Sequence, residues 1–199
     1  IKMKFKKQII YLPIEVEVRE LVSKILLAMR AAQTGHKVVI GQKSILNKSL
    51  KYFEKGLYIA GGAYSNYLSF FEKIVSNGFR VLILEEEGLI TFKKNLYLDM
   101  RTDRQCLNLV DRYYLWGDHQ YQMMLSQYSK QKEKFLVTGN PRFDFLNKKS
   151  KNIYKDEINF IQKKYKNFGL ICTCFPSINH YDENLNVVEE LKSRNTLRS

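Results

Sequence analysis

Residues 135–144 read Phe-Leu-Val-Thr-Gly-Asn-Pro-Arg-Phe-Asp and join an apolar run to a polar turn. The run FLVTG predicts a buried β-strand. Gly139 allows backbone angles that other residues avoid, and Pro141 has no N–H to give to a sheet. The strand should therefore end here, and in open α/β sheets ligands bind at the carboxyl ends of strands. Three polar residues follow this strand end: Asn140, Arg142 and Asp144.

Strand and helix patterns alternate along the rest of the chain, which is typical of a parallel α/β sheet. The expected strands are 8–12, 37–40, 56–59, 80–84, 113–116, 134–138 and 168–175. The expected helices are 17–34, a short one after Ser44, 65–77, 102–111, 120–127 and one ending near 165, while 90–99 has no clear pattern. The predicted fold class is α/β, with a Rossmann-like parallel sheet.

The composition is that of a globular protein, with 45% hydrophobic and 13% aromatic residues in 199. No apolar run approaches the roughly 18–20 residues of a membrane span, and no secretory-signal pattern is visible. The three cysteines are unevenly spaced, which favours buried thiols in a reducing cytoplasm over a disulfide framework. No CxxC or HxxxH spacing occurs, so a metal site is not expected.

The formal net charge of +13 has two interpretations. One is attraction to an anionic membrane surface, a nucleic acid or a phosphorylated substrate. The other is a lysine-rich solvated surface, which the scatter of lysines along the whole chain favours. Weak peripheral contact with the anionic inner face of the cytoplasmic membrane is the second hypothesis. Nucleic acid is not expected, because no helix carries a concentrated basic stripe with interleaved aromatic residues.

Three adjacent carboxylates, Glu85, Glu86 and Glu87, follow the apolar strand 80–84 and precede Gly88. Neighbouring carboxylates repel one another, and this repulsion can raise the pKa of one of them. A perturbed carboxylate at a strand end suits a general base or a nucleophile. The alternative is a solvated acidic turn.

Other polar residues also follow expected strands. Trp116 could stack on a sugar or a base, or pack in the core; His119 could carry a proton, or lie on the surface near a helix start. In the connection after the first strand, Glu17 or Glu20 is expected to stabilise the positive end of the following helix. Because every such group follows a strand, the set predicts a site at the carboxyl edge of the sheet.

The order of five segments carries a family resemblance: residues 11–44 (YLPIEVEVRELVSKILLAMRAAQTGHKVVIGQKS), 82–89 (LILEEEGL), 114–120 (YLWGDHQ), 137–146 (VTGNPRFDFL) and 168–180 (FGLICTCFPSINH). Together they resemble the surface carbohydrate biosynthesis protein family, bacterial glycosyltransferases of the GT-B type that build lipopolysaccharide or capsule. The GNPRFD turn is also similar to the GxPRxD turn of teichoic-acid glycerophosphotransferases. Bacterial β-Kdo transferases are a more distant comparison.

The resemblance implies two Rossmann-like domains with the active site between them. Residues 1–147 would form the N-terminal, acceptor-side domain, 148–166 a linker with a helix, and 167–199 the start of a truncated donor-side domain. The expected substrates are a nucleotide-sugar donor and a glycan or lipid-linked acceptor, with no cofactor or metal.

The resemblance also implies roles for single residues. Glu86 would be the base or nucleophile, with Glu87 second, and Arg142 and the His180 loop would lie near the donor phosphates. Glu85 stands where family members commonly have Asp. The substrate-binding candidates are Glu15, Trp116, Gly117, Gln120, Asn140, Arg142, Asp144, Asn179 and His180.

Three alternatives remain open at this point. A CDP-alcohol phosphotransferase and a nucleotide-sugar epimerase could both use the same scaffold. The non-enzyme alternative is an inactive, truncated module that binds the acceptor or a membrane.

Overall fold

The computed structural model describes residues 7–89, 94–147 and 150–171. The chain divides into two compact units, Ile1–Ile153 and Tyr154–Ser199. The division lies within the segment 148–166 that the sequence predicts as a linker.

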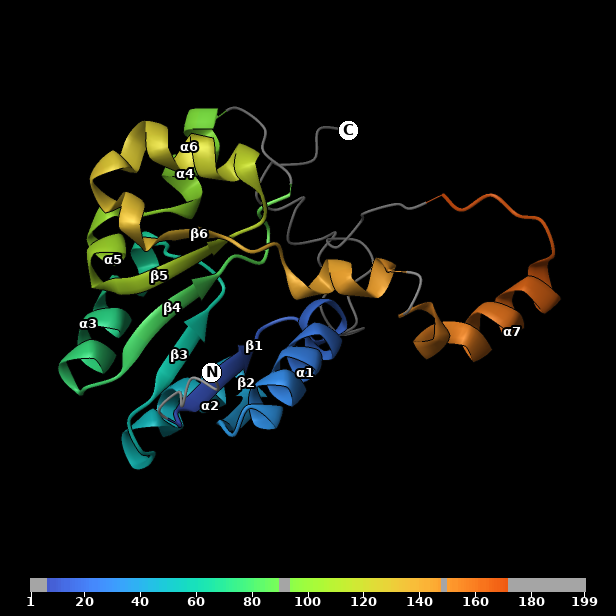
Figure 1. The fold of residues 1–199 in the computed structure, drawn as a ribbon, viewed down its shortest axis with the longest axis horizontal. Helices are drawn as coiled ribbons and strands as arrows, with labels where there is room; N and C mark the ends of the chain where they lie inside the picture. The colour runs from blue at the N-terminus through green and yellow to red at the C-terminus, as the bar shows by residue number, and fades with distance from the viewer. Residues whose placement is uncertain (1–6, 90–93, 148–149, 172–199) are drawn as a thin grey trace, which may run out of the picture. The chain divides into compact units, whose positions relative to one another are not determined.

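The first unit contains a six-stranded sheet in which every neighbouring pair is parallel (Figure 1). Its strands are β1 (Ile9–Ile14), β2 (Lys37–Gln42), β3 (Leu57–Ala60), β4 (Arg80–Leu84), β5 (Val110–Leu115) and β6 (Phe135–Val137). Their order across the sheet is β2-β1-β3-β4-β5-β6. The expected α/β class with a Rossmann-like parallel sheet is therefore confirmed.

The α-helices of this unit are α1 (Glu17–Gln33), α2 (Lys43–Ser49), α3 (Leu68–Ser76), α4 (Lys94–Arg101), α5 (Arg104–Leu109) and α6 (Asp118–Tyr128). Its short 3-10 helices are η1 (Leu50–Tyr52), η2 (Ser65–Tyr67), η3 (Ser129–Lys134) and η4 (Pro141–Leu146), and η5 (Lys151–Tyr154) reaches the division. The second unit contains α7 (Lys155–Tyr165).

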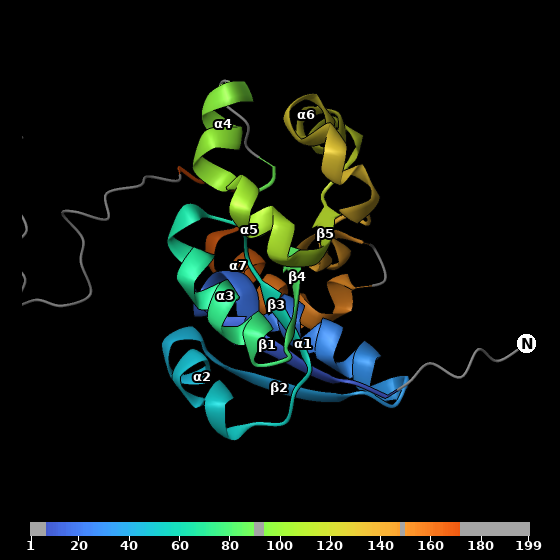
Figure 2. The same cartoon turned by 90° about the vertical axis from the view of Figure 1, so that its left-hand side faces the viewer.

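The two faces of the sheet differ in their cover. Alternate residues of each strand point to opposite faces, so Val81 and Ile83 join a large core with residues of α2 to α6. Leu82 and Leu84 face the other way and join a smaller cluster with Leu27 of α1. Figures 1 and 2 show α3 and α5 on one side of the sheet and α1 on the other. In the described part of the first unit, α1 is the α-helix that contributes to the smaller cluster.

The strand order places a topological switch point between β1 and β3. From β1 the chain moves outward through α1 to β2, and it then returns past β1 to β3. The connections that leave β1 and β3 therefore diverge, and ligand-binding crevices of open α/β sheets form at such points.

The stretch 135–144 corrects one expectation. Leu136 and Val137 are 41% and 45% exposed, so only Phe135 of β6 is buried. Among the strands that the structure describes, β6 is the last in the order and pairs with β5 alone. Gly139 has a φ of +77°, the left-handed conformation that its place before the turn suggested.

Several boundaries also differ from expectation. The helix expected over 102–111 ends at Leu109, because Val110 pairs with Val81 and begins β5. Tertiary pairing overrides the helical pattern there. The strand expected over 168–175 is not formed over residues 168–171, and residues 172–175 lie outside the described residues.

Candidate functional site

The N-terminus of α1 is occupied by a side chain of the same helix. The carboxylate of Glu20 accepts hydrogen bonds from the backbone N–H groups of Glu15 and Val16, both at 3.1 Å. Both donors lie just before Glu17, the first residue of the helix, and the positive end of the helix favours the negative charge. The prediction that Glu17 or Glu20 has this role is confirmed for Glu20.

Glu20, Lys24 and Glu86 form a buried ion cluster beside the switch point. The Lys24 Nζ lies 2.8 Å from Glu20 and 3.1 Å from Glu86, and it also donates to the Pro13 carbonyl at 2.6 Å. Burial alone would raise the pKa of Glu20, but hydrogen bonds from Lys24, the Glu15 backbone and Arg19 lower it to about 2. Burial raises the pKa of Glu86, although Lys24 acts against this.

Glu87 lies between two arginines. Its carboxylate is 2.9 Å from the Arg19 guanidinium of α1 and is paired with Arg101 of α4. Its side chain is 41% exposed, whereas the Glu86 side chain is only 8% exposed. A substrate could reach Glu87 without movement of the chain, but not Glu86.

Glu85, the first of the three adjacent carboxylates, is fully buried, although it is not among the residues predicted to act on the substrate. Its carboxylate accepts hydrogen bonds from the Tyr113 hydroxyl at 2.6 Å and from the Glu87 backbone N–H at 3.2 Å. Burial raises the pKa of Glu85 to about 7, against the opposing effects of Tyr113 and Arg101. The sequence did contain a signal, because the alternation of β4 places residue 85 on the same face as Ile83, which packs against the helices.

Trp116 and Gln120 hold each other and the acidic loop, by which we mean Glu85–Gly88. The indole N–H of Trp116 donates to the Glu85 carbonyl at 2.6 Å. The backbone N–H of Trp116 donates to Gln120 Oε1 at 2.8 Å. Gln120 is buried and donates in turn to the Tyr97 hydroxyl at 2.8 Å. Gln120, a predicted substrate-binding residue, thus has both ends of its side chain engaged within the protein.

Gly88 is required by the close approach of Trp116. A Cβ atom at residue 88 would lie 2.5 Å from Trp116 Cδ1 and 2.9 Å from Gln120 Nε2. At Gly117, by contrast, nothing lies within 4 Å of an added Cβ. The EEG and WGxxQ segments therefore contact each other, although 28 residues separate Gly88 from Trp116 in numbering.

The Asn-Pro-Arg turn also binds the backbone of the acidic loop. Asn140 Nδ2 donates to the Glu85 carbonyl at 2.9 Å, and Arg142 donates to the Glu86 carbonyl at 3.1 Å. Asn140 Oδ1 accepts from the Arg142 N–H at 2.9 Å, which closes the start of η4. The predicted meeting of these strand ends at one edge is confirmed for the acidic loop, Trp116 and the turn.

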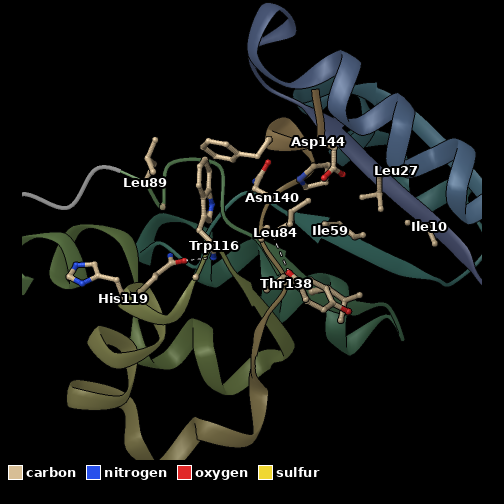
Figure 3. A pocket seen from close by; sticks show the side chains of 18 of the residues that line it. Ile10, Leu27, Ile59, Leu84, Leu89, Trp116, His119, Thr138, Asn140 and Asp144 are labelled. Atoms are coloured by element: carbon tan, nitrogen blue, oxygen red, sulfur yellow. Dashed lines mark hydrogen bonds between the residues drawn. The ribbon is translucent and has the colours of Figure 1, made fainter. Parts of the chain in front are cut away.

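A groove of about 760 Å³ lies on the less covered face of the sheet (Figure 3). Ile10 and Leu27 lie at one end of this sheet groove, and Trp116 and His119 lie at the other. Its apolar wall is formed by strand and helix residues: Ile10, Leu27, Leu57, Ile59, Leu82 and Leu84. Asn140, Asp144 and Phe143 also line it, and the Phe143 ring meets the Trp116 ring edge-on at 5.2 Å.

The remaining candidates are dispersed. Glu15 pairs with Lys43 at 2.9 Å, beside a second cavity of about 10 Å³, which has room for about one water molecule. His119 is exposed in the first turn of α6. Asn179 and His180 lie outside the described residues.

Among the residues that the structure describes, no group of three His, Cys, Asp or Glu side chains is arranged to hold a metal ion. Within the same residues, no helix has the length and apolar character needed to cross a bilayer. Cys106 is buried, as expected for a structural thiol, whereas Cys172 and Cys174 lie outside this part of the chain.

No known protein family, no curated protein and no solved structure matches this chain significantly.

Proposed function

We propose that this chain is the acceptor-side part of a GT-B-type glycosyltransferase of surface polysaccharide synthesis. In this proposal it transfers a sugar from a nucleotide-sugar donor to a lipid-linked acceptor. The observation that carries it is the acidic loop, held at the carboxyl edge of a parallel sheet directly beside the sheet groove. Gly88 and Leu89, which follow the carboxylates, line that groove.

The acidic loop supports the acid–base part of the proposal. A general base must reach the hydroxyl proton of the acceptor, so that the hydroxyl oxygen can attack the donor sugar. Glu87 has the exposed carboxylate, and Glu86 is buried against Lys24. Its exposure favours Glu87 over Glu86 as the base, with Arg19 and Arg101 beside it to balance charge.

The start of α1 supports binding of an acceptor, and not of a nucleotide, at this switch point. Rossmann domains that bind nucleotides hold phosphate at the N-terminus of the first helix, after a glycine-rich turn. Here the connection from β1 to α1 contains no glycine, and the Glu20 carboxylate lies at the helix start, bound to the backbone N–H groups of Glu15 and Val16. A phosphate would meet that negative charge, so the donor nucleotide is assigned to another part of the enzyme.

The sheet groove supports an amphiphilic acceptor. Aliphatic side chains form one end of it, and an aromatic ring with polar groups forms the end nearest the acidic loop. An alkyl chain suits the first end, while Trp116 can stack on a sugar ring at the second. This arrangement favours a lipid-linked acceptor over a free glycan.

Binding can be tested with Trp116, the only tryptophan in the chain. Its fluorescence is titrated with dodecyl maltoside, below the concentration at which micelles form, and with maltose, which has the same sugar head without the chain. We expect saturable binding that is much tighter for dodecyl maltoside. Equal or absent responses would overturn the groove assignment.

Two variants of α1 sharpen this test. Leu27→Gln places a polar group in the groove and should weaken binding of dodecyl maltoside at least several-fold. Val22→Gln changes a 46% exposed residue of the same helix that does not line the groove, and it should bind as the wild type does.

Turnover is tested with the whole enzyme, including the part that binds the donor, on a panel of nucleotide sugars and a lipid-linked acceptor, followed by product analysis. A new glycoside supports the proposal, and Glu87→Gln should abolish its formation without loss of folding. A phosphodiester product would indicate a CDP-alcohol phosphotransferase instead, and an epimerised sugar an epimerase. Amphiphile binding without consumption of any donor would leave only a binding module.

A further inference from the structure

Glu85 differs from the other carboxylates around it in having uncharged partners. Glu20, Glu86 and Glu87 each form an ion pair with Lys24, Arg19 or Arg101. Within the described part of the chain, no such ion pair includes Glu85. Its partners are the Tyr113 hydroxyl, the Tyr64 hydroxyl at 3.5 Å and the Glu87 backbone N–H. A fully buried carboxylate without a cation is costly in its charged form.

Glu85 is connected to Glu87 by two routes. The direct route is the hydrogen bond from the Glu87 N–H to Glu85 Oε1. The second passes through Tyr64, whose hydroxyl lies near Oε1 and accepts a 3.0 Å hydrogen bond from Arg101, the partner of Glu87. Because Tyr64 accepts from Arg101, its single proton points to one of two acceptors at 3.5 Å, Glu85 Oε1 or the Gly61 carbonyl. A charged Glu85 is the stronger of these two acceptors.

We propose that Glu85 is a positioning residue that binds and releases one proton, and thereby sets the position of the Glu87 carboxylate. The charged form accepts from the Glu87 N–H and from Tyr64, which draws the loop inward. The neutral form carries a hydrogen on one oxygen and is a weaker acceptor, so the Glu87 backbone and the Tyr64–Arg101 contact are released. The step is a single proton transfer between the carboxyl group and solvent.

Burial places this exchange close to neutral pH, because it raises the pKa of Glu85 to about 7. Burial also raises the pKa values of Tyr64, Tyr97 and Tyr113 above the ordinary tyrosine value of 10. These three hydroxyls therefore remain neutral near pH 7. The titratable and charged groups around Glu85 are Tyr113 of β5, Tyr97 and Arg101 of α4, Tyr64 before η2, Glu86 and Glu87 of the loop, and Arg142 of η4, which binds the Glu86 carbonyl.

The first experiment is a pH titration of Trp116 fluorescence, because the indole N–H binds the Glu85 carbonyl. His119 lines the same groove, so its imidazole is removed to leave no second ionisable ring beside the reporter. The titration is therefore made in the His119→Gln variant. We expect a transition with a midpoint near pH 7, which is lost when Glu85→Gln is added. The matched change Glu87→Gln should retain a transition.

Retention of the full transition in the Glu85→Gln variant would overturn the inference. If that variant does not fold, the carboxyl carbons of ¹³C-labelled glutamate are followed by NMR in the wild-type protein. A glutamate that titrates near pH 7 supports the inference, and its absence contradicts it.

The effect of Glu85 on turnover rests on the proposed function. The response of the acidic loop to pH, measured by Trp116 fluorescence, does not. With an active enzyme, Glu85→Gln should alter the pH profile of kcat, whereas a purely structural role would lower activity equally at every pH. A fluorescence transition without any turnover would contradict the proposed function and leave this inference standing.

Discussion

The indole N–H of Trp116 donates a 2.6 Å hydrogen bond to the backbone carbonyl of Glu85. Asn140 donates to the same oxygen at 2.9 Å. These two bonds tie the ends of β4, β5 and β6 together at a single carbonyl group. The motifs that follow the three strands therefore act as one structural unit, and the carboxylates of the acidic loop depend on it for their position.

Gly88→Ala should destabilise the fold by about 1–3 kcal/mol, because the new methyl group would overlap the Trp116 ring. Gly117→Ala is the matched control, since its Cβ meets open space and its backbone is extended. Urea unfolding of both variants measures the difference. Equal stabilities would show that the loop and the ring separate easily.

Lys24→Met should cost about 3–5 kcal/mol, because it leaves Glu20 and Glu86 buried without their shared cation. Glu86→Gln should cost less, since Lys24 keeps Glu20 as a partner. For comparison, Lys37→Met removes an exposed pair with Glu54 and should change stability by no more than about 0.5 kcal/mol. A similar small loss for Lys24→Met in thermal or urea unfolding would argue against a buried ion cluster.

Asn140→Ala should lower stability by about 1–3 kcal/mol, because the buried Glu85 carbonyl loses one donor and the Arg142 N–H loses its acceptor. Asp144→Ala, in the same turn, changes an exposed side chain and should leave the unfolding midpoint nearly unchanged. It should instead affect ligand binding, because Asp144 lines the groove. The reverse ranking in unfolding experiments would contradict this assignment.

The low pKa of Glu20 predicts that the protein loses stability in acid. Its folded pKa of about 2 lies below its ordinary value of 4.5, so the unfolded state binds a proton first as the pH falls. The stability from Glu20 is fully present above pH 4.5 and is lost as the pH falls through about 2. In Glu20→Gln this acid dependence should be shallower, as measured by unfolding free energy against pH.

Glu85 affects the pH dependence of stability in the opposite direction, and over a different pH range. Its folded pKa of about 7 is above the ordinary value of 4.5, so its contribution is present below pH 4.5 and is lost as the pH rises through 7. Glu85→Gln should therefore remove a fall in stability between pH 4.5 and 7 and leave the acid limb unchanged. An unaltered slope in this window would place the titration elsewhere.

Local pattern was sufficient for most of the elements. Strand β4 lies where its apolar run predicted it, over 80–84, and α1 begins at Glu17 and ends one residue before the expected Thr34. These segments are bounded by turn residues and have one clear period. Val110 was misassigned because a short helix runs into a strand without a turn, and only pairing with Val81 decides the boundary.

The sequence predicted where the candidate site lies, but not what its side chains contact. Polar residues after parallel strands must meet at one edge, so the proximity of Glu86, Trp116 and Asn140 followed from their positions. Whether each one faces solvent depends on neighbours far along the chain. Asn140, Arg142 and Gln120 proved to bind the protein itself.

The sequence by itself determined the alternation of strands and helices, the parallel sheet and the edge at which its polar residues gather, because apolar periodicity and turn residues act locally. Only the tertiary structure decided that Glu85 is the carboxylate buried without a cation, that Glu86 is enclosed with Lys24 and that Glu87 reaches solvent. Three identical side chains in a row have the same local chemistry. They differ because charge is stabilised or penalised by what surrounds it, and those surroundings come from α1, α4 and β5.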